Sequence, residues 1–495
     1  MNLKLAFALM LSGILLTSCA NTTSPKNATQ DTNPMTQNTD FALPEIPPAK
    51  TFQHPLPTQM TLSNGAQFWY IQNALVPLMT LRVVFERGAS GDDPNKSGCA
   101  NFTAALLKEG ANGKTAQQIS DDIEYIGASI SPAVTQDNAL ITIQVLSQFF
   151  ENSLDILDEI WMHPDFTQES FSRIQKLILN GLKQRQDNPN AVAKLVSNAA
   201  YFEGHPYARS ADGTEASISA VTLEDIKADY QAIFQNTPPV FFAVGNLPAG
   251  TVRDMLDKRF GARKLPEQAP AQAESFTNRQ EKMRLIIVDK PAAPQTVIRI
   301  FQPAIPAPSL KTLTWQFLNI PFGGSFTSRL MQNIREDKGF SYGASSAVSA
   351  MKHAGVLLST SSVAADVTGL ALREFISELS MLPTGNFSQD EFERARETWK
   401  SEFVQSFETQ SGALVTIAGL YLNRKPVSAI NDFARQLESF TLDDFNAVAR
   451  EFPTLDKATI VLVGDKNAIL SQLKDLSDLN LPDPEFWSDQ GIPVK

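Results

Sequence analysis

Residues 98–110 read G-C-A-N-F-T-A-A-L-L-K-E-G, a short apolar run bounded by glycines. Side chains three and four positions apart lie on the same face of an α-helix. Phe102 and Leu106 have this spacing, and with Leu107 they give the segment one strongly apolar side. We therefore expect a helix that packs against a core and holds a fixed place in the fold.

A second face of the same helix has the spacing of a metal site but none of its chemistry. Asn101, Ala104 and Ala105 occupy positions i, i+3 and i+4, as the ligands and general base of an H-x-x-E-H motif do. Zinc takes lone pairs from imidazole, thiolate or carboxylate groups. Alanine offers none of these, and the asparagine amide is a poor zinc ligand.

The surrounding residues resemble the pitrilysin/insulinase-type zinc metallopeptidases (inverzincins), whose active helix reads roughly G-x-A-H-F-x-E-H-x-x-x-x-G. The three positions above stand where that pattern has His, Glu and His. Residues 179–189, L-N-G-L-K-Q-R-Q-D-N-P, resemble the family segment L-E-E-I-x-x-R-x-D-N-P that carries its third ligand. Asn180 and Gly181 stand at the acidic positions of that segment. The resemblance therefore implies that this chain holds no metal of its own.

The second half of the chain keeps a different family motif. Residues 322–342, F-G-G-S-F-T-S-R-L-M-Q-N-I-R-E-D-K-G-F-S-Y, resemble the second-domain pattern G-G-x-x-x-S-R-L-x-x-x-x-R-x-x-x-G-x-x-Y. Arg335 and Tyr342 match the Arg and Tyr that the family places across the cavity from zinc. We expect Gly339 to cap a helix with Arg335 in its last turn, and Tyr342 to begin the next strand.

Two interpretations of Arg335 and Tyr342 stay open at this point. Their side chains can converge to hold a peptide backbone and to stabilise the charge that develops on an attacked carbonyl oxygen. Alternatively, Arg335 is a solvated charge that interacts with a helix dipole, and Tyr342 is an ordinary strand aromatic.

Short matches recur in the same order along the chain. The segment T-L-E-D at 222–225 recurs as T-L-D-D at 441–444, and the Val-Gly pair at 244–245 recurs at 463–464. Near the start of each half, P-x-x-x-x-R occurs at 77–82 and again at 294–299. Their nearly constant offset predicts a tandem duplication.

Strand and helix patterns alternate within the first half. Asn64-Gly65 predicts a hairpin, Thr115 and Gln118 form a capping box, and Gly127 ends the helix that they begin. We expect strands at 60–62, 67–71, 78–85, 140–146 and 240–244, and helices at 114–126, 150–161 and 171–185. The predicted fold class is α+β: two tandem homologous domains, each a mixed, mostly antiparallel sheet with helices packed on one face, forming half of a clamshell.

The N-terminus has the features of a targeting segment. Lys4 precedes an apolar run at 5–16, which is too short to span a bilayer as a mature helix. The run ends in L-T-S-C at Cys19, which resembles a bacterial lipobox and implies lipidation of that cysteine. Because no Asp follows Cys19, we expect a lipid anchor at the outer membrane, facing the periplasm. The alternative is an ordinary secretory signal with a chance cysteine.

These patterns divide the chain as follows: signal peptide 1–18, polar tether 19–50, domain with the degenerate zinc motif 51–264, linker 265–282, domain with the Arg/Tyr motif 283–478, and tail 479–495. Cys99 is the one cysteine left besides Cys19, so an internal disulfide is not expected, and it is better explained as a small core residue than as a nucleophile. The net charge of −11 argues against nucleic-acid binding. The histidines, at positions 54, 163, 205 and 353, share no metal-ligand spacing.

The resemblance implies a zinc-less subunit of a two-chain envelope metallopeptidase. A homologous zinc-bearing H-x-x-E-H chain would supply the metal, while Arg335 and Tyr342 would bind extended peptides and stabilise the transition state. The alternative is a non-catalytic peptide-binding or scaffolding pseudopeptidase. A lone peptidase with an unusual metal site is a third, weaker interpretation. The sequence names neither the substrate nor the partner.

Overall fold

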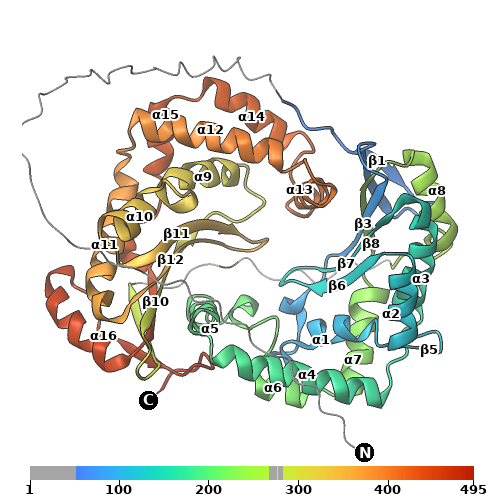
Figure 1. Cartoon of the computed structure of the whole chain (residues 1–495), viewed down its shortest axis with the longest axis horizontal. Helices are drawn as coiled ribbons and strands as arrows, with labels where there is room; N and C mark the ends of the chain where they lie inside the picture. The colour runs from blue at the N-terminus through green and yellow to red at the C-terminus, as the bar shows by residue number, and fades with distance from the viewer. Residues whose placement is uncertain (1–51, 267–275, 277–281, 495) are drawn as a thin grey trace, which may run out of the picture. The chain divides into compact units, whose positions relative to one another are not determined.

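The computed structural model describes residues 52–266, 276 and 282–494. The predicted signal peptide, Cys19 and the tether lie outside the described residues, as does most of the predicted linker. The chain from Phe52 onward forms one compact unit (Figure 1). Within the described ranges, no helix combines the length and the apolar character needed to cross a membrane.

The first half contains a six-stranded sheet in the order β1-β2-β8-β3-β7-β6. Its strands are β1 (Thr58–Thr61), β2 (Gln67–Gln72), β3 (Leu78–Phe85), β6 (Ser129–Val134), β7 (Ala139–Leu146) and β8 (Pro239–Gly245). Only β2 and β8 run parallel, and the other neighbours are antiparallel. The predicted hairpin joins β1 to β2, with Gly65 at φ +89°. The mixed, mostly antiparallel sheet is confirmed.

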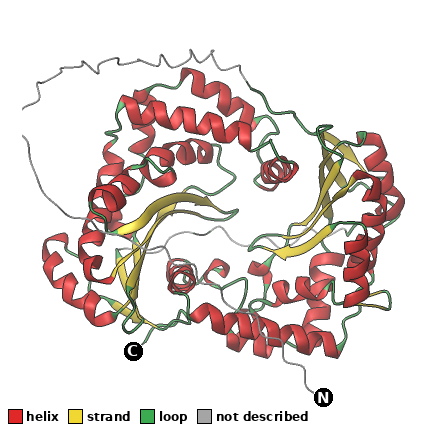
Figure 2. Ribbon diagram, viewed as in Figure 1, coloured by secondary structure: helices red, strands yellow, loops and turns green. Residues whose placement is uncertain are grey.

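Helices cover one face of this sheet (Figure 2). The predicted capping box is present, because Thr115 and Gln118 exchange hydrogen bonds at the start of α2 (Ala116–Tyr125). The strand side chains Phe68, Phe85 and Phe241 meet Trp161 of α3 (Phe150–Met162) in a buried aromatic core. The helices of this half also include α1 (Cys99–Leu106), α4 (Gln168–Gln186), α6 (Glu215–Ala220), α7 (Leu223–Tyr230) and α8 (Ala249–Phe260).

The second half repeats this plan in the order β11-β12-β10-β13-β9-β14. Its strands are β9 (Arg284–Asp289), β10 (Gln295–Ala304), β11 (Ser341–Ala350), β12 (Gly355–Ala364), β13 (Thr459–Gly464) and β14 (Glu485–Trp487). Thr222 and Thr441, from the two T-L-x-D segments, cap equivalent helices, α7 and α15 (Leu442–Ala449), with the same capping box. Strand β14 comes from the segment assigned to the tail. The other helices used below are α9 (Lys311–Asn319), α10 (Arg329–Met331), α11 (Thr368–Met381), α12 (Gln389–Gln405) and α14 (Ala429–Ser439).

The two halves exchange one helix each. Helix α5 (Pro189–Tyr201) of the first half packs its Val192 and Val196 against β9, β10 and β13 of the second sheet. Helix α13 (Gln410–Leu422) of the second half packs its Leu414 and Ile417 against β2, β3 and β8 of the first sheet. Each sheet is therefore covered on its second face by a helix from the other half, a feature that the sequence patterns did not predict.

Candidate functional site

Helix α1 forms where the sequence predicted it. Gly98 precedes it at φ +91°, and a Cβ there would lie 2.8 Å from the backbone of Gly213, so the position requires glycine. The carboxylate of Asp92 accepts hydrogen bonds from the amides of Gly98 at 2.7 Å and Ala100 at 3.2 Å. The apolar side is buried as expected and stacks Phe102 on Phe171 of α4, with ring centroids 5.0 Å apart.

The degenerate zinc face of α1 does not remain an open metal site. Ala104 is 1% exposed and belongs to the core, whereas Ala105 is exposed. Asn101 donates its amide to the carbonyl of Ala211 at 3.2 Å and to Asp212 Oδ1 at 3.1 Å. Among the described residues, no group of three His, Cys, Asp or Glu side chains could hold a metal ion. Zinc therefore does not fit the residues present here.

The second predicted segment lies on α4, next to α1. Asn180 and Gly181 are both exposed, and a Cβ on Gly181 would meet nothing within 4 Å. One turn later, Arg185 pairs with Asp212 Oδ2 at 3.3 Å and donates to the carbonyl of Gly213 at 2.9 Å. Asp212 thus links both helices that carry ligands in the family pattern. Sequence reasoning missed this link, because Asp212 lies in a loop without a motif.

One buried carboxyl group, that of Asp92, and one half-buried carboxyl group, that of Asp229, lie beside α1. Burial, together with the charge of Asp229, raises the pKa of Asp92 to about 7. Burial raises the pKa of Asp229, on α7, to about 6, and its Oδ2 is buried without a hydrogen-bond partner in the described structure. Burial also raises the pKa of the Cys99 thiol. A thiol that resists ionisation is a poor nucleophile, which agrees with the expected core role of Cys99.

The Arg/Tyr motif has the local structure that we expected. Helix α10 continues as a wider, π-type turn at Gln332–Asp337, which contains Arg335. Gly339, at φ +64°, ends it and donates its amide to the carbonyl of Arg335 at 3.0 Å. Tyr342 is the second residue of β11 and is 91% exposed.

Arg335 is partly exposed and stacked. Its guanidinium carbon lies 4.7 Å from the centroid of the Phe326 ring. Its Nε lies 3.2 Å from Glu336 Oε1, and its side chain is 38% exposed. The guanidinium therefore packs against an aromatic ring, while the side chain as a whole stays partly exposed. The convergence of Arg335 with Tyr342 on one point stays a prediction.

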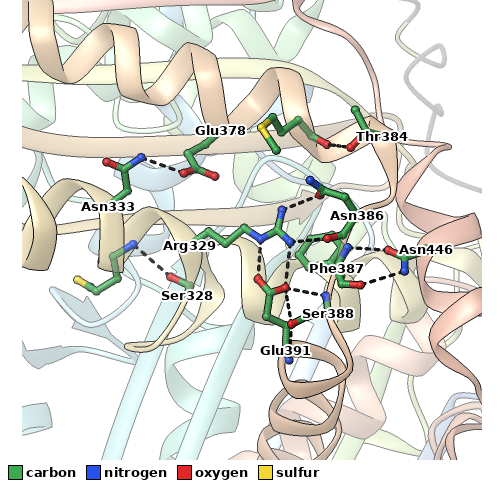
Figure 3. Close-up of polar contacts among 12 residues, drawn as sticks. Ser328, Arg329, Asn333, Glu378, Thr384, Asn386, Phe387, Ser388, Glu391 and Asn446 are labelled. Atoms are coloured by element: carbon green, nitrogen blue, oxygen red, sulfur yellow. Dashed lines mark hydrogen bonds and ion pairs between the residues drawn. The ribbon is translucent and has the colours of Figure 1, made fainter.

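A second arginine of the same motif fixes this helix (Figure 3). Arg329 forms two bonds with Glu391 of α12, Nε to Oε1 at 2.6 Å and Nη2 to Oε2 at 2.9 Å. It also donates to Asn386 Oδ1 at 2.9 Å and lies 4.1 Å from the centroid of the Phe387 ring. Burial alone would raise the pKa of Glu391, but hydrogen bonds from Arg329 and Ser388 outweigh it and hold that pKa below its ordinary value.

Asn333 fixes the other side of the helix. Its amide donates to Glu374 at 3.1 Å and to Glu378 at 2.9 Å, both on α11. The turn that carries Arg335 is thus attached to α12 through Arg329 and to α11 through Asn333. The S-R-L motif was visible in the sequence, but the contact of its Arg329 with Glu391 is seen only in the structure.

The histidine nearest the N-terminus has a structural role. The ring of His54 stacks on Phe407 with centroids 3.4 Å apart and contacts Phe403 at 4.0 Å. Burial lowers its pKa to about 4. Its backbone exchanges two hydrogen bonds with Asn431 of α14, so the start of the described chain is attached to the second half.

Two segments of the chain match known protein families. The family described as insulinase (peptidase family M16) matches residues 69–215, and the peptidase M16 inactive domain matches residues 220–398. The chain belongs to peptidase family M16. Together the two M16 matches span more than half of the chain.

Individual M16 relatives extend over most of the described residues. The non-peptidase homolog YmxG of Helicobacter pylori is 24% identical over 406 residues, which cover 80% of this chain and 91% of that protein. The peptidase M16 inactive domain from Pseudomonas fluorescens superimposes with a TM-score of 0.76 at 25% identity, over 83% of this chain and 98% of that chain. The periplasmic protease PqqL from Escherichia coli gives a TM-score of 0.69 at 15% identity, over 88% of this chain and 51% of that chain.

Proposed function

We propose that this M16 chain is the zinc-less subunit of a two-chain metallopeptidase of the cell envelope. The observation that carries the proposal is the contrast between two motifs of one fold. The metal-ligand positions on α1 and α4 hold Asn, Ala and Gly, whereas Arg335 and Tyr342 are kept. The turn that carries Arg335 is attached to its neighbours through Arg329 and Asn333, and Tyr342 is 91% exposed.

The retained pair suits the binding of a peptide carbonyl. The Arg335 guanidinium has a permanent charge and several N–H donors, and the Tyr342 hydroxyl adds one more donor. Fixed donors stabilise the oxygen of an attacked carbonyl more than the ground-state oxygen, because charge develops there. A homologous H-x-x-E-H chain would supply the metal and the base, so Arg335 and Tyr342 act on a substrate shared with that chain.

The length comparison supports a second subunit. This chain aligns with 51% of the PqqL chain, so in that protein the same fold occupies about half of one longer polypeptide. The proposed partner would correspond to the other half of that polypeptide.

A second candidate function is a pseudopeptidase that binds or scaffolds peptides without cleaving them. The bonds from Asn101 and Arg185 to Asp212 favour it, because they give the former ligand helices a structural contact of their own. The name of the Helicobacter pylori relative, a non-peptidase homolog, points the same way.

Co-purification with a zinc-bearing homologue, followed by peptide-cleavage assays, tests the first proposal. Arg335→Ala and Tyr342→Phe should each lower kcat of the pair by about a hundredfold, the effect of removing one oxyanion donor. Arg253→Ala on α8 and Tyr125→Phe on α2, at the 88% exposed Tyr125, are matched controls that should leave cleavage unchanged. Unchanged cleavage in the Arg335 and Tyr342 variants would exclude the catalytic role, and a chain that recruits no zinc-bearing homologue would favour the pseudopeptidase.

We further propose that the chain is lipid-anchored through Cys19 at the outer membrane, facing the periplasm. The support is the L-T-S-C sequence at the end of the apolar run. Metabolic labelling with a radioactive fatty acid should mark the wild-type chain and not Cys19→Ser. Labelling of the variant, or its absence from the wild type, would leave the ordinary secretory signal as the explanation.

A further inference from the structure

The repeated P-x-x-x-x-R motif places one arginine in the middle of each sheet. Arg82 lies on β3 directly opposite Thr142 of β7, and Thr142 lies opposite Ser131 of β6. Residues directly opposite each other on neighbouring strands have side chains on the same face. These three side chains therefore form a row that runs from the third strand to the free edge of the sheet.

The second half contains the same row at equivalent positions. Arg299 of β10 lies opposite Thr360 of β12, which lies opposite Ser345 of β11. In both rows the serine is exposed, and the threonine and arginine are half-buried. We call these the two Arg–Thr–Ser rows.

Each row lies beside an exchanged helix. Phe242, opposite Arg82 on the other side, packs under α13, and Val461, opposite Arg299, packs under α5. The helices thus cover the inner strands and bury part of each arginine, whereas the serine end of the row stays open. Neighbouring strands lie about 5 Å apart, so the row is about 10 Å long and each arginine lies within reach of the threonine beside it.

Neither arginine has an acidic partner in the described structure. Arg82 donates from Nε to Thr142 Oγ1 at 3.1 Å, and Arg299 Nε is buried without a hydrogen-bond partner. Burial lowers the pKa of Arg82, and it lowers that of Arg299 to about 10, with no carboxylate opposing either shift. By contrast, Arg284 and Arg329, which are also mostly buried, each contact a glutamate. A half-buried cation without a counter-ion is costly unless an anion binds to it.

We propose that the Arg–Thr–Ser rows bind carboxylates of extended peptides, so that this chain prefers peptides with acidic side chains or a free C-terminal carboxylate. The guanidinium provides a planar pair of donors for the carboxylate, and the serine hydroxyl at the open end provides another. Thr142 adds a third in the first row, whereas the Thr360 hydroxyl is already donated to the carbonyl of Ile298 at 2.9 Å. The inference rests on the peptide binding proposed above and names its substrate class.

Binding of three fluorescent peptides to the full chain tests the proposal. All three are blocked at the N-terminus, and the first two are also blocked at the C-terminus. One peptide carries a central glutamate, the second carries glutamine in its place, and the third is the glutamine peptide with a free C-terminal carboxylate. The glutamate peptide, the carboxylate-terminated peptide, or both should bind about tenfold more tightly than the neutral peptide, as expected for a charge-assisted contact. The two arms separate a side-chain carboxylate from a terminal one.

The tighter binding of the carboxylate-bearing peptides should disappear in the double variant Arg82→Gln/Arg299→Gln and should be kept in Arg253→Gln. Because loss of a half-buried arginine can unfold the chain, Ser131→Ala/Ser345→Ala at the exposed ends is the second variant. It should weaken binding of the acidic peptides about threefold without changing Tm. Equal binding of all three peptides would contradict carboxylate binding by the Arg–Thr–Ser rows, but it would leave the proposed peptide binding intact. Absence of binding by every peptide would overturn both.

Discussion

Arg329 and Glu391 form a two-point ion pair that joins the first residue of α10 to the first turn of α12. Their side chains are only 17% and 16% exposed, so water screens the pair poorly. The same glutamate completes the capping box of α12 with Ser388. The orientation of the helix that carries Arg335 therefore depends on a contact made six residues earlier.

Removing one partner of this pair should be costly. We expect Arg329→Ala to lower the free energy of unfolding by about 3 kcal/mol, because it leaves Glu391 buried without its counter-ion. Arg435→Ala, which removes an ion pair whose partners are both 51% exposed, should cost less than about 1 kcal/mol. Urea denaturation measures both values. Because the folded pKa of Glu391 is depressed, its contribution should be present above the unfolded pKa of about 4.5 and be lost as the pH falls below it. Equal costs for the two variants would contradict the structural role of Arg329.

The Asp229 carboxyl should give the opposite pH dependence. Its folded pKa, about 6, is above the unfolded value of 3.8, so the folded state holds a proton that the unfolded state has released. Stability should therefore fall as the pH rises from about 4 to about 6, and the full penalty should remain above that range. Asp229→Asn removes the charge and should stabilise the chain at pH 8 by up to about 3 kcal/mol, with little effect at pH 4.

Thermal unfolding of wild type and Asp229→Asn across that pH range measures the difference. Asp225→Asn on the same helix is the contrasting control, since the pKa of Asp225 is lowered and its carboxylate contacts Lys96 at 2.7 Å. This control should lose stability at neutral pH. A constant gap between wild type and Asp229→Asn at every pH would contradict the prediction.

Adjacent positions of the former zinc motif should respond differently to substitution. Ala104→Glu places a carboxylate in the core and should cost about 3 kcal/mol, because the position is 1% exposed. Ala105→His, at an exposed position, should change stability by less than about 0.5 kcal/mol. Chemical denaturation of the two single variants compares them directly. If Ala104→Glu proved neutral, the packing of α1 against the sheet would be looser than described.

The exchanged helices should make the two halves fold as one unit. Leu414→Ala removes a fully buried side chain of α13 from beneath the first sheet and should cost about 3 kcal/mol. Tryptophan fluorescence, to which Trp69 beside α13 contributes, and far-UV circular dichroism should report the same single transition. Val415→Ala, at the 54% exposed neighbour, is the control and should change stability little. Two separate transitions would show that the halves are independent.

The sequence predicted what depends on local chemistry. The capping box at Thr115 and the αL cap at Gly339 follow from side chains within a few residues, and both are present. The sheet class was predicted from strand patterns, and the family was predicted from a resemblance to its motifs.

Other features depended on partners distant in the sequence. An apolar stripe on α5 or α13 predicts burial but does not name the sheet that it meets. The hydrogen bond from Asn101 to Asp212 joins residues 111 positions apart, and no sequence motif pairs these two residues. Arg329 was visible as a motif letter, but its acceptor Glu391 lies 62 positions further along the chain.

The exchange of α5 and α13 also has a consequence for how the chain is made. Strand β8 completes the first sheet at Gly245, but the helix that covers its second face begins at Gln410. A growing chain must therefore keep Trp69, Val84 and Phe242 in an uncovered layer until the second half has been synthesised. Such late, long-range contacts slow folding and leave apolar surface exposed to aggregation in the meantime. For an exported chain, staying unfolded and bound to chaperones until α13 is available would avoid this exposure.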